Sequence, residues 1–224
     1  MKPDEIEILG IIIMEPAVSF SDIITGLISL MLAYSLWRKK SPDKSLQLFM
    51  YYFVFMGIAT VVAGIIGHGL LYYISPDWKI VGWSLSAIGL FFLEQASLEY
   101  FKTQLGTGLF KNLKILTKLQ LVAFFILLMF PFTRSFTLVQ FNATFCYIGI
   151  ILPLYSYSIY VWKNPSSWLV IAAIALASLA ALVYNMKIAI NQWFNHHVFT
   201  HVLMALYVLL IYYAVNKLHT ATKD

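Results

Sequence analysis

Seven runs of apolar residues, each close to the length of a membrane-spanning helix, dominate this sequence of 224 residues. A helix needs about 20 mostly apolar residues to cross the hydrocarbon core of a bilayer. In the whole chain 61% of the residues are hydrophobic and only 11% are charged, against roughly a quarter charged in a soluble domain. The sequence therefore predicts an all-α polytopic membrane protein, a bundle of seven transmembrane helices, and excludes an ordinary soluble globular domain.

Charged residues, proline and glycine separate the apolar runs. The predicted spans are Pro16–Trp37, Leu46–Ile74, Ile80–Phe101, Leu113–Phe130, Phe136–Trp162, Trp168–Met186 and His197–Asn216. They divide the chain into a short interfacial segment (residues 1–15), a seven-helix domain (16–216) and a cytoplasmic tail (217–224). Before the first span the chain mixes acidic residues with isoleucines, so we expect a short helix at the membrane interface there.

Lysine and arginine indicate the orientation, because cytoplasmic loops carry an excess of both. With the N-terminus outside, eleven of the fifteen basic residues fall on the inner side, and Lys2, Lys79, Arg134 and Lys187 fall on the outer side. This count predicts an outer N-terminus and a cytoplasmic C-terminus. The basic residues form short clusters between spans rather than one helical face, so no nucleic acid is expected as a partner.

Ionisable side chains inside spans are expensive and indicate function by default. The candidates are Glu15, Asp22, His68, Glu94, His197 and His201. Odd spans begin outside and even spans end outside in the predicted topology. All the candidates except Glu94 therefore fall in one layer, the outer half of the bilayer. For Glu94, deeper in the bundle, we expect a hydrogen bond near Tyr155 or Tyr157.

The spacing of His197 and His201 predicts a metal site. Residues four apart lie on one face of a helix, at the separation where two imidazoles can share a metal ion. His68 supplies a third imidazole from the same layer, with Asp22 or a water molecule in the remaining position. Three histidines and an oxygen ligand are typical of catalytic zinc. The alternative is that these histidines only form hydrogen bonds between helices.

The same residues resemble a known superfamily. Seven spans with an outer N-terminus, a histidine late in the second span (Gly64-Ile65-Ile66-Gly67-His68) and an HxxxH motif opening the last (His197 to His201) are similar to the alkaline ceramidases and the progestin and adiponectin receptors. The resemblance implies a membrane-embedded zinc hydrolase of lipid amides or esters, with zinc on His68, His197 and His201.

Two positions depart from the pattern of that superfamily. Its members usually carry a serine four residues before the first histidine, where this chain has Gly64. They often carry an aspartate near the start of the third span, where the nearest candidate is Asp77 in the preceding loop. We expect Asp22 to take that role. The pair Glu15-Pro16 followed by Asp22 also resembles small bacterial membrane proteins, so we expect a bacterial inner (plasma) membrane location.

The leading functional hypothesis is a zinc-dependent intramembrane hydrolase with a membrane lipid as substrate. Zinc polarises a carbonyl and activates water. Asp22 is the candidate base, and Ser84 is the first candidate for stabilising the oxyanion, beside Ser86, Asn142 and Asn185. The alternatives are a haem protein with His68 and a histidine of the last span as axial ligands, an ion or solute transporter using Asp22, His68 and Lys187, and a structural protein.

Overall fold

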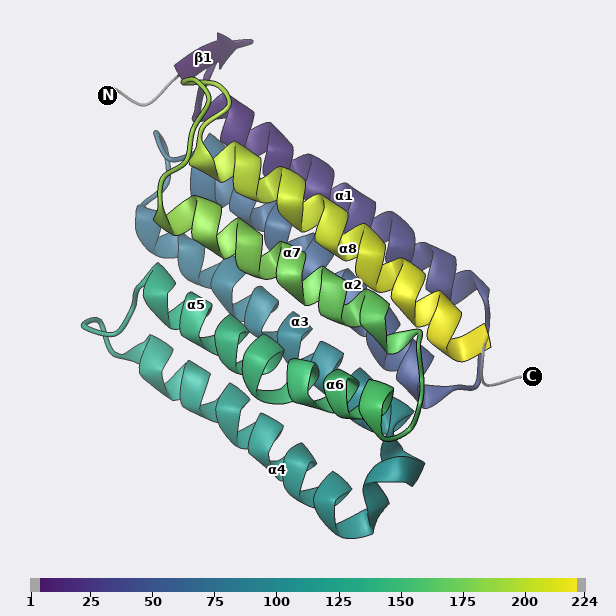
Figure 1. Cartoon of the computed structure of the whole chain (residues 1–224). Helices are drawn as coiled ribbons and strands as arrows, with labels where there is room; N and C mark the ends of the chain where they lie inside the picture. The colour runs from purple at the N-terminus through teal and green to yellow at the C-terminus, as the bar shows by residue number, and fades with distance from the viewer. Residues whose placement is uncertain (1–4, 221–224) are drawn as a thin grey trace.

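The computed structural model describes residues 5–220, which form one bundle of long helices with a small hairpin at one end (Figure 1). The hairpin strands are β1 (Glu5–Ile8) and β2 (Ile11–Met14). The helical elements are α1 (Pro16–Arg38), α2 (Lys44–Val62) with η1 (Ala63–Gly69), η2 (Pro76–Trp78) with α3 (Lys79–Tyr100), α4 (Lys102–Met129), α5 (Phe136–Thr144) with η3 (Phe145–Ile151) and α6 (Leu152–Tyr160), α7 (Ser167–Asn185) and α8 (His196–Thr220).

The described residues contain seven helices that are long and apolar enough to cross a membrane, which confirms the predicted all-α, seven-helix class. The largest difference lies in the fourth helix, which starts at Lys102 rather than at Leu113. The predicted break survives as a kink, because Gly106 has a φ of 69° and a ψ of 161° inside this helix. The last helix continues to Thr220, into the predicted tail, and residues 221–224 lie outside the described part.

The short helix expected before the first span is wrong, because the structure has an antiparallel hairpin there. Glu5 pairs with Met14 and Ile8 with Ile11. The two residues between the strands, Leu9 and Gly10, have φ values of 52° and 80°. Positive φ at both central positions is what a type I′ hairpin turn requires. The turn therefore selects paired strands where composition alone suggested an amphipathic helix.

The helices pack so that the first and last of them lie side by side. Helix α1 packs against both α2 and α8, α2 packs against α3, and α7 packs against α8. Figure 1 shows α4 at the far edge of the bundle from α1 and α8. It also shows that α1 begins and α8 ends at opposite ends of the bundle. We call the end that carries β1 and β2 the hairpin end.

Glycines allow α1 and α2 to approach closely at two levels. A Cβ atom added at Gly26 would lie 2.7 Å from the carbonyl oxygen of Gly57. A Cβ atom at Gly64 would lie 2.7 Å from the carbonyl oxygen of Ser19. The Ser19 hydroxyl donates a hydrogen bond of 2.7 Å to the Gly64 carbonyl. Small residues commonly bring membrane helices together in this way.

Two stretches of π-helix interrupt the second and fifth spans, η1 and η3. Single turns of π-helix are rare and occur often at functional sites. Residue His68 lies in η1, so the wider turn sets the direction of its side chain. In η3 the π-helix ends just before Pro153, which has no backbone N–H to donate. Neither stretch has a signature in the hydrophobic pattern.

Candidate functional site

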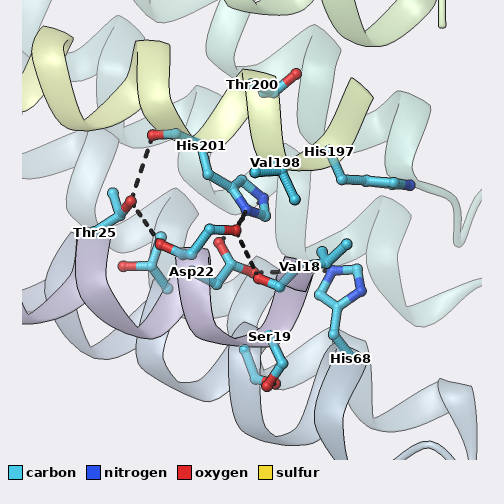
Figure 2. Close-up of polar contacts among 12 residues, drawn as sticks. Val18, Ser19, Asp22, Thr25, His68, His197, Val198, Thr200 and His201 are labelled. Atoms are coloured by element: carbon cyan, nitrogen blue, oxygen red, sulfur yellow. Dashed lines mark hydrogen bonds and ion pairs between the residues drawn. The ribbon is translucent and has the colours of Figure 1, made fainter. Parts of the chain in front are cut away.

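Three helical elements meet at the hairpin end and carry the predicted cluster of polar residues. Asp22 comes from the second turn of α1, His68 from η1, and His197 and His201 from the first turns of α8. Figure 2 shows the rings of His68 and His201 beside the turn of α1 that carries Asp22, with His197 one helical turn before His201. Strand β2 packs against η1, so the hairpin lies next to this cluster.

The Asp22 carboxylate lies at the centre of the cluster, and 6% of its side chain is exposed. One oxygen, Oδ1, lies 3.2 Å from Nε2 of His201. The other oxygen, Oδ2, lies 3.8 Å from Nε2 of His68. A buried carboxylate is costly inside a span unless a cation or a hydrogen-bond donor pairs with it. The Nε2 atoms of both histidines thus face the same carboxylate.

The other ring nitrogen of His201 is held by α1. Its Nδ1 lies 2.8 Å from the hydroxyl oxygen of Ser21. That hydroxyl donates its single hydrogen to the carbonyl of Val18, at 2.9 Å. Ser21 therefore accepts from His201, and Nδ1 carries the proton. The neutral ring consequently presents a lone pair at Nε2, toward Asp22.

Glu15 fixes the ring of His68 through Nδ1, as Ser21 fixes the ring of His201. Its Nδ1 donates to Oε2 of Glu15 over 2.5 Å. This hydrogen bond lowers the pKa of the Glu15 carboxyl below its ordinary value of 4.5, against partial burial, which raises it. Glu15 has a left-handed backbone (φ 45°, ψ 53°) at the N-cap of α1, directly before Pro16, and its side chain makes no capping bond. Its carboxylate is thereby free to reach His68.

Donor and acceptor roles therefore leave two Nε2 lone pairs directed at one carboxylate. Lone pairs and a carboxylate repel one another unless a positive charge lies among them. Metal-binding histidines typically donate their other N–H to a carboxylate or a hydroxyl, which fixes the tautomer and the ring orientation. Glu15 and Ser21 supply these two partners here. The tautomers of His68 and His201 are thus those that metal-binding histidines commonly have.

His197 brings a third imidazole next to His68. Its ring centroid lies 5.6 Å from that of His68. Its other ring neighbours are Tyr184, at 5.3 Å, and His196, at 4.2 Å. The centroids of His68 and His201 lie 6.3 Å apart. Two of the three predicted histidine ligands, His68 and His201, thus lie against Asp22, and His197 lies beside His68.

The distances in the cluster can be compared with those of a zinc site. Four ligands at about 2.0 Å in a tetrahedron lie about 3.3 Å from one another, and imidazole centroids then lie about 5 Å apart. The two distances from Nε2 to oxygen, 3.2 and 3.8 Å, lie on either side of the first value, and the two centroid distances exceed the second by about 0.6 and 1.3 Å. As the side chains of residues 5–220 now lie, no group of three or more His, Cys, Asp or Glu forms a ready metal site.

A cavity of about 590 Å³ opens beside the cluster. Asp22, His68, His197 and His201 form one part of its wall. The remainder is mostly apolar and comes from α2, α3, α5, η3 and α7. A volume of this size is typical of a small-molecule site, and a mostly apolar wall with a few convergent polar groups is its usual character. A substrate in this cavity would contact the histidines directly.

The other predicted site residues divide between the cavity and the rest of the bundle. Asn185 and Ser86 line the cavity, whereas Ser84 and Asn142 are not among its lining residues. The Ser86 hydroxyl donates to the carbonyl of Trp83. Asn142 accepts from the side chain of Gln120, at 3.1 Å. Of these two serines, only Ser86 therefore lines the cavity in which the oxyanion donor is expected.

Two residues that line the cavity, Lys79 and Tyr184, are not predicted as site residues from the sequence. Lys79 was assigned only to an outer loop, yet it lines the cavity together with Asp22. Tyr184 lines the cavity and contacts both His196 and His197. The position of Lys79 at the start of an odd span, in the same layer as the histidines, was the available signal.

Glu94 is separate from the site, as its depth predicts, but its expected partners are wrong. It is 1% exposed and lies beside Cys146 and Gln120. Within residues 5–220 its Oε1 atom has no hydrogen-bond partner. Tyr155 instead donates to Ser97, at 3.3 Å. Glu94 is therefore a buried acid in the packed interior of the bundle rather than part of the histidine cluster.

Comparison with known proteins adds a family but no activity. The profile of a family of unknown function (DUF6962) matches residues 17–220, which includes Asp22 and all the histidines discussed above. No curated protein matches the chain. No solved structure matches it either.

Proposed function

The chain belongs to the family of unknown function DUF6962, and from its site we propose that it is a zinc-dependent hydrolase that cleaves an amide or ester bond of a lipid within the membrane. The observation that carries this proposal is the arrangement of His68 and His201. Each ring donates from Nδ1 to a fixed partner and directs Nε2 at Asp22. A cation bound by both Nε2 atoms explains why two lone pairs and a carboxylate are gathered in an apolar bundle.

Each residue of the cluster has a role in this proposal. His68, His197 and His201 hold zinc, which leaves the fourth position open, as catalytic zinc sites require. Bound zinc supplies a Lewis acid that polarises a carbonyl and activates water. Asp22 accepts the proton of the attacking water, because its carboxylate already lies within 4 Å of two of the proposed ligands. Glu15 and Ser21 are positioning residues that fix the rings of His68 and His201.

The cavity supports a lipid as the substrate class. Its apolar wall accommodates an acyl chain, and its polar part places the scissile carbonyl beside the histidines. The excess of lysine and arginine at the opposite end supports an outer position for the hairpin end, and we propose that the site lies in the outer half of a bacterial inner membrane. A substrate in that position enters from the bilayer rather than from water.

Release of fatty acid from lipid tests the proposal. The zinc-loaded protein is incubated in detergent with a total bacterial lipid extract, and free fatty acids are measured by mass spectrometry. We expect release by the wild type and none by Asp22→Asn, which keeps the shape of the side chain and loses its proton acceptor. His196→Ala serves as the matched control, because His196 is not among the residues that line the cavity. This variant should retain activity. Equal release by the wild type and Asp22→Asn contradicts the proposal.

A further inference from the structure

The charged groups in the wall of the cavity are few. Among the described residues that line it, Lys79 is the one cation and Asp22 is the one carboxylate. The three proposed zinc ligands are the only other titratable groups there apart from tyrosines. A charge in such a wall is weakly screened, because most of the surrounding surface is apolar. The charge of Lys79 therefore bears on what the cavity binds.

Lys79 lies next to the histidine cluster. It is the first residue of α3, and a Cβ atom added at Gly67 of η1 would lie 3.7 Å from its Cγ atom. Its ammonium group is close enough to interact electrostatically with Asp22 and Glu15. None of the ion pairs within 4.0 Å in residues 5–220 includes it. Its charge is consequently not neutralised by a direct protein partner.

The net charge of the cavity wall depends on whether zinc is bound, and this inference therefore rests on the proposed function. Zinc contributes +2, Lys79 contributes +1 and Asp22 contributes −1, which gives +2 for the lining. Glu15, behind His68 and outside the lining, reduces this to +1. A cavity wall with a net positive charge favours anionic ligands.

The two parts of the cavity are chemically different. Residues Phe136, Val139 and Phe141 of α5 and Ala177 and Ala181 of α7 contribute apolar surface. Lys79, Asp22 and the histidines contribute the charged part. A molecule that satisfies both has an apolar chain and a charged group near the bond that is cleaved. Lys79 is the donor available for that charged group.

We infer that the substrate is an anionic amphiphile, an acyl amide or ester whose polar half carries a carboxylate or a phosphate, and that Lys79 binds this anion. Lys79 thus acts as a specificity residue rather than as part of the zinc site. A neutral substrate with the same acyl chain lacks the group that pairs with the ammonium. The preference for the anion then depends on the charge at position 79.

Binding of matched lipids to the detergent-purified protein tests this inference without any need for turnover. N-oleoylglycine and N-oleoylethanolamine share an acyl chain and an amide, and only the first carries a negative charge. Oleoyl lysophosphatidate and monooleoylglycerol form a second pair, for phosphate against a neutral headgroup. We expect about tenfold tighter binding of the anionic member of at least one pair, a modest value for a charge-assisted hydrogen bond. Comparing the two pairs distinguishes carboxylate from phosphate.

Three variants assign the preference to Lys79. Lys79→Met retains the apolar stem and should reduce the preference to about onefold, whereas Lys79→Arg should restore it. Lys187→Met removes a positive charge from the same end of the bundle, outside the cavity lining, and should leave the preference unchanged. Equal binding of both members of both pairs to the wild type overturns the inference, and so does a preference that survives in Lys79→Met.

Zinc content measured on the same samples separates this inference from the proposed function. Protein without zinc that still prefers the anion through Lys79 contradicts the proposed hydrolase and leaves the anionic ligand supported. Zinc-containing protein without the preference contradicts the role of Lys79 alone.

Discussion

Gly64 is the position where a single methyl group should disturb the site most selectively. A Cβ atom there would lie 2.7 Å from the Ser19 carbonyl oxygen, 2.9 Å from Cγ1 of Ile23 and 3.0 Å from Cβ of Asp22. Ordinary contact begins at 3.4 Å, so η1 and α1 must separate by about 0.7 Å, the difference between 3.4 and 2.7 Å. Gly64→Ala should therefore move His68 away from Asp22.

The expected size of the effect follows from the overlap. Inserting a methyl group into a packed interface costs about 1–3 kcal/mol. A loss of about 2 kcal/mol corresponds to a Tm lower by about 4–8 °C for a chain of this length. A zinc site tolerates errors of about 0.5 Å, so we also expect zinc affinity to fall about 10-fold or more. Thermal unfolding in detergent and competition with a zinc chelator measure the two effects.

Gly67→Ala is the matched control for this experiment. Gly67 lies in the same π-helix, and a Cβ atom there would meet its nearest neighbours at 3.7 and 3.9 Å, which is ordinary contact. Both substitutions gain the same helix propensity, so the difference between them isolates the close approach of η1 to α1. Similar Tm values and zinc affinities for the two variants would refute this account of the interface.

Three further substitutions have expected outcomes. The pKa of Glu15 is lowered in the folded protein, so its contribution to stability is complete above pH 4.5 and is lost as the pH falls through the lowered value. Measurements of Tm against pH should show this loss of stability in acid for the wild type and not for Glu15→Gln. Ser21→Ala removes the acceptor for Nδ1 of His201, and chelator competition should show zinc affinity about 10-fold lower, with Ser86→Ala unchanged. Glu94→Gln replaces a buried carboxyl that has an unpaired oxygen with a neutral amide, and Tm should rise; a fall in Tm would show that the carboxyl is needed.

Seven spans could be predicted from the sequence because length and hydropathy decide membrane insertion. The fourth span is instructive, because the predicted break around Gly106 exists as a kink with a positive φ, while the helix begins before it at Lys102. The prediction of a helix before Pro16 is wrong because composition does not reveal the backbone conformation of a turn. Leu9 and Gly10 both adopt positive φ and thereby select a hairpin.

The proximity of His68 and His201 to Asp22 could be predicted from depth alone. Segments that cross a membrane in alternating directions must bring residues of one layer to one level, so His68, His197 and His201 were expected near Asp22. The orientation of the rings did not follow. It depends on the π-helix that carries His68, on the left-handed backbone of Glu15 and on the Ser21 hydroxyl, which are local geometries without a periodic signature.

Choice among the candidate hydroxyls and cations was beyond the sequence. Ser84 and Ser86 are two residues apart on α3, and only the latter lines the cavity. Helix phase decides which side chain faces inward, and a span that is apolar all round does not reveal its phase. Lys79 counts only as evidence of topology in the sequence, because its layer is predictable whereas the direction of its side chain is not.

The central claim is that three histidines hold zinc, and elemental analysis of the detergent-purified protein tests it most directly. The wild type and His196→Ala should each contain close to one zinc per chain. His68→Ala and His201→Ala should contain none while remaining folded. Folded wild-type protein without zinc after exposure to the metal, or full zinc content in either of the last two variants, would contradict the account.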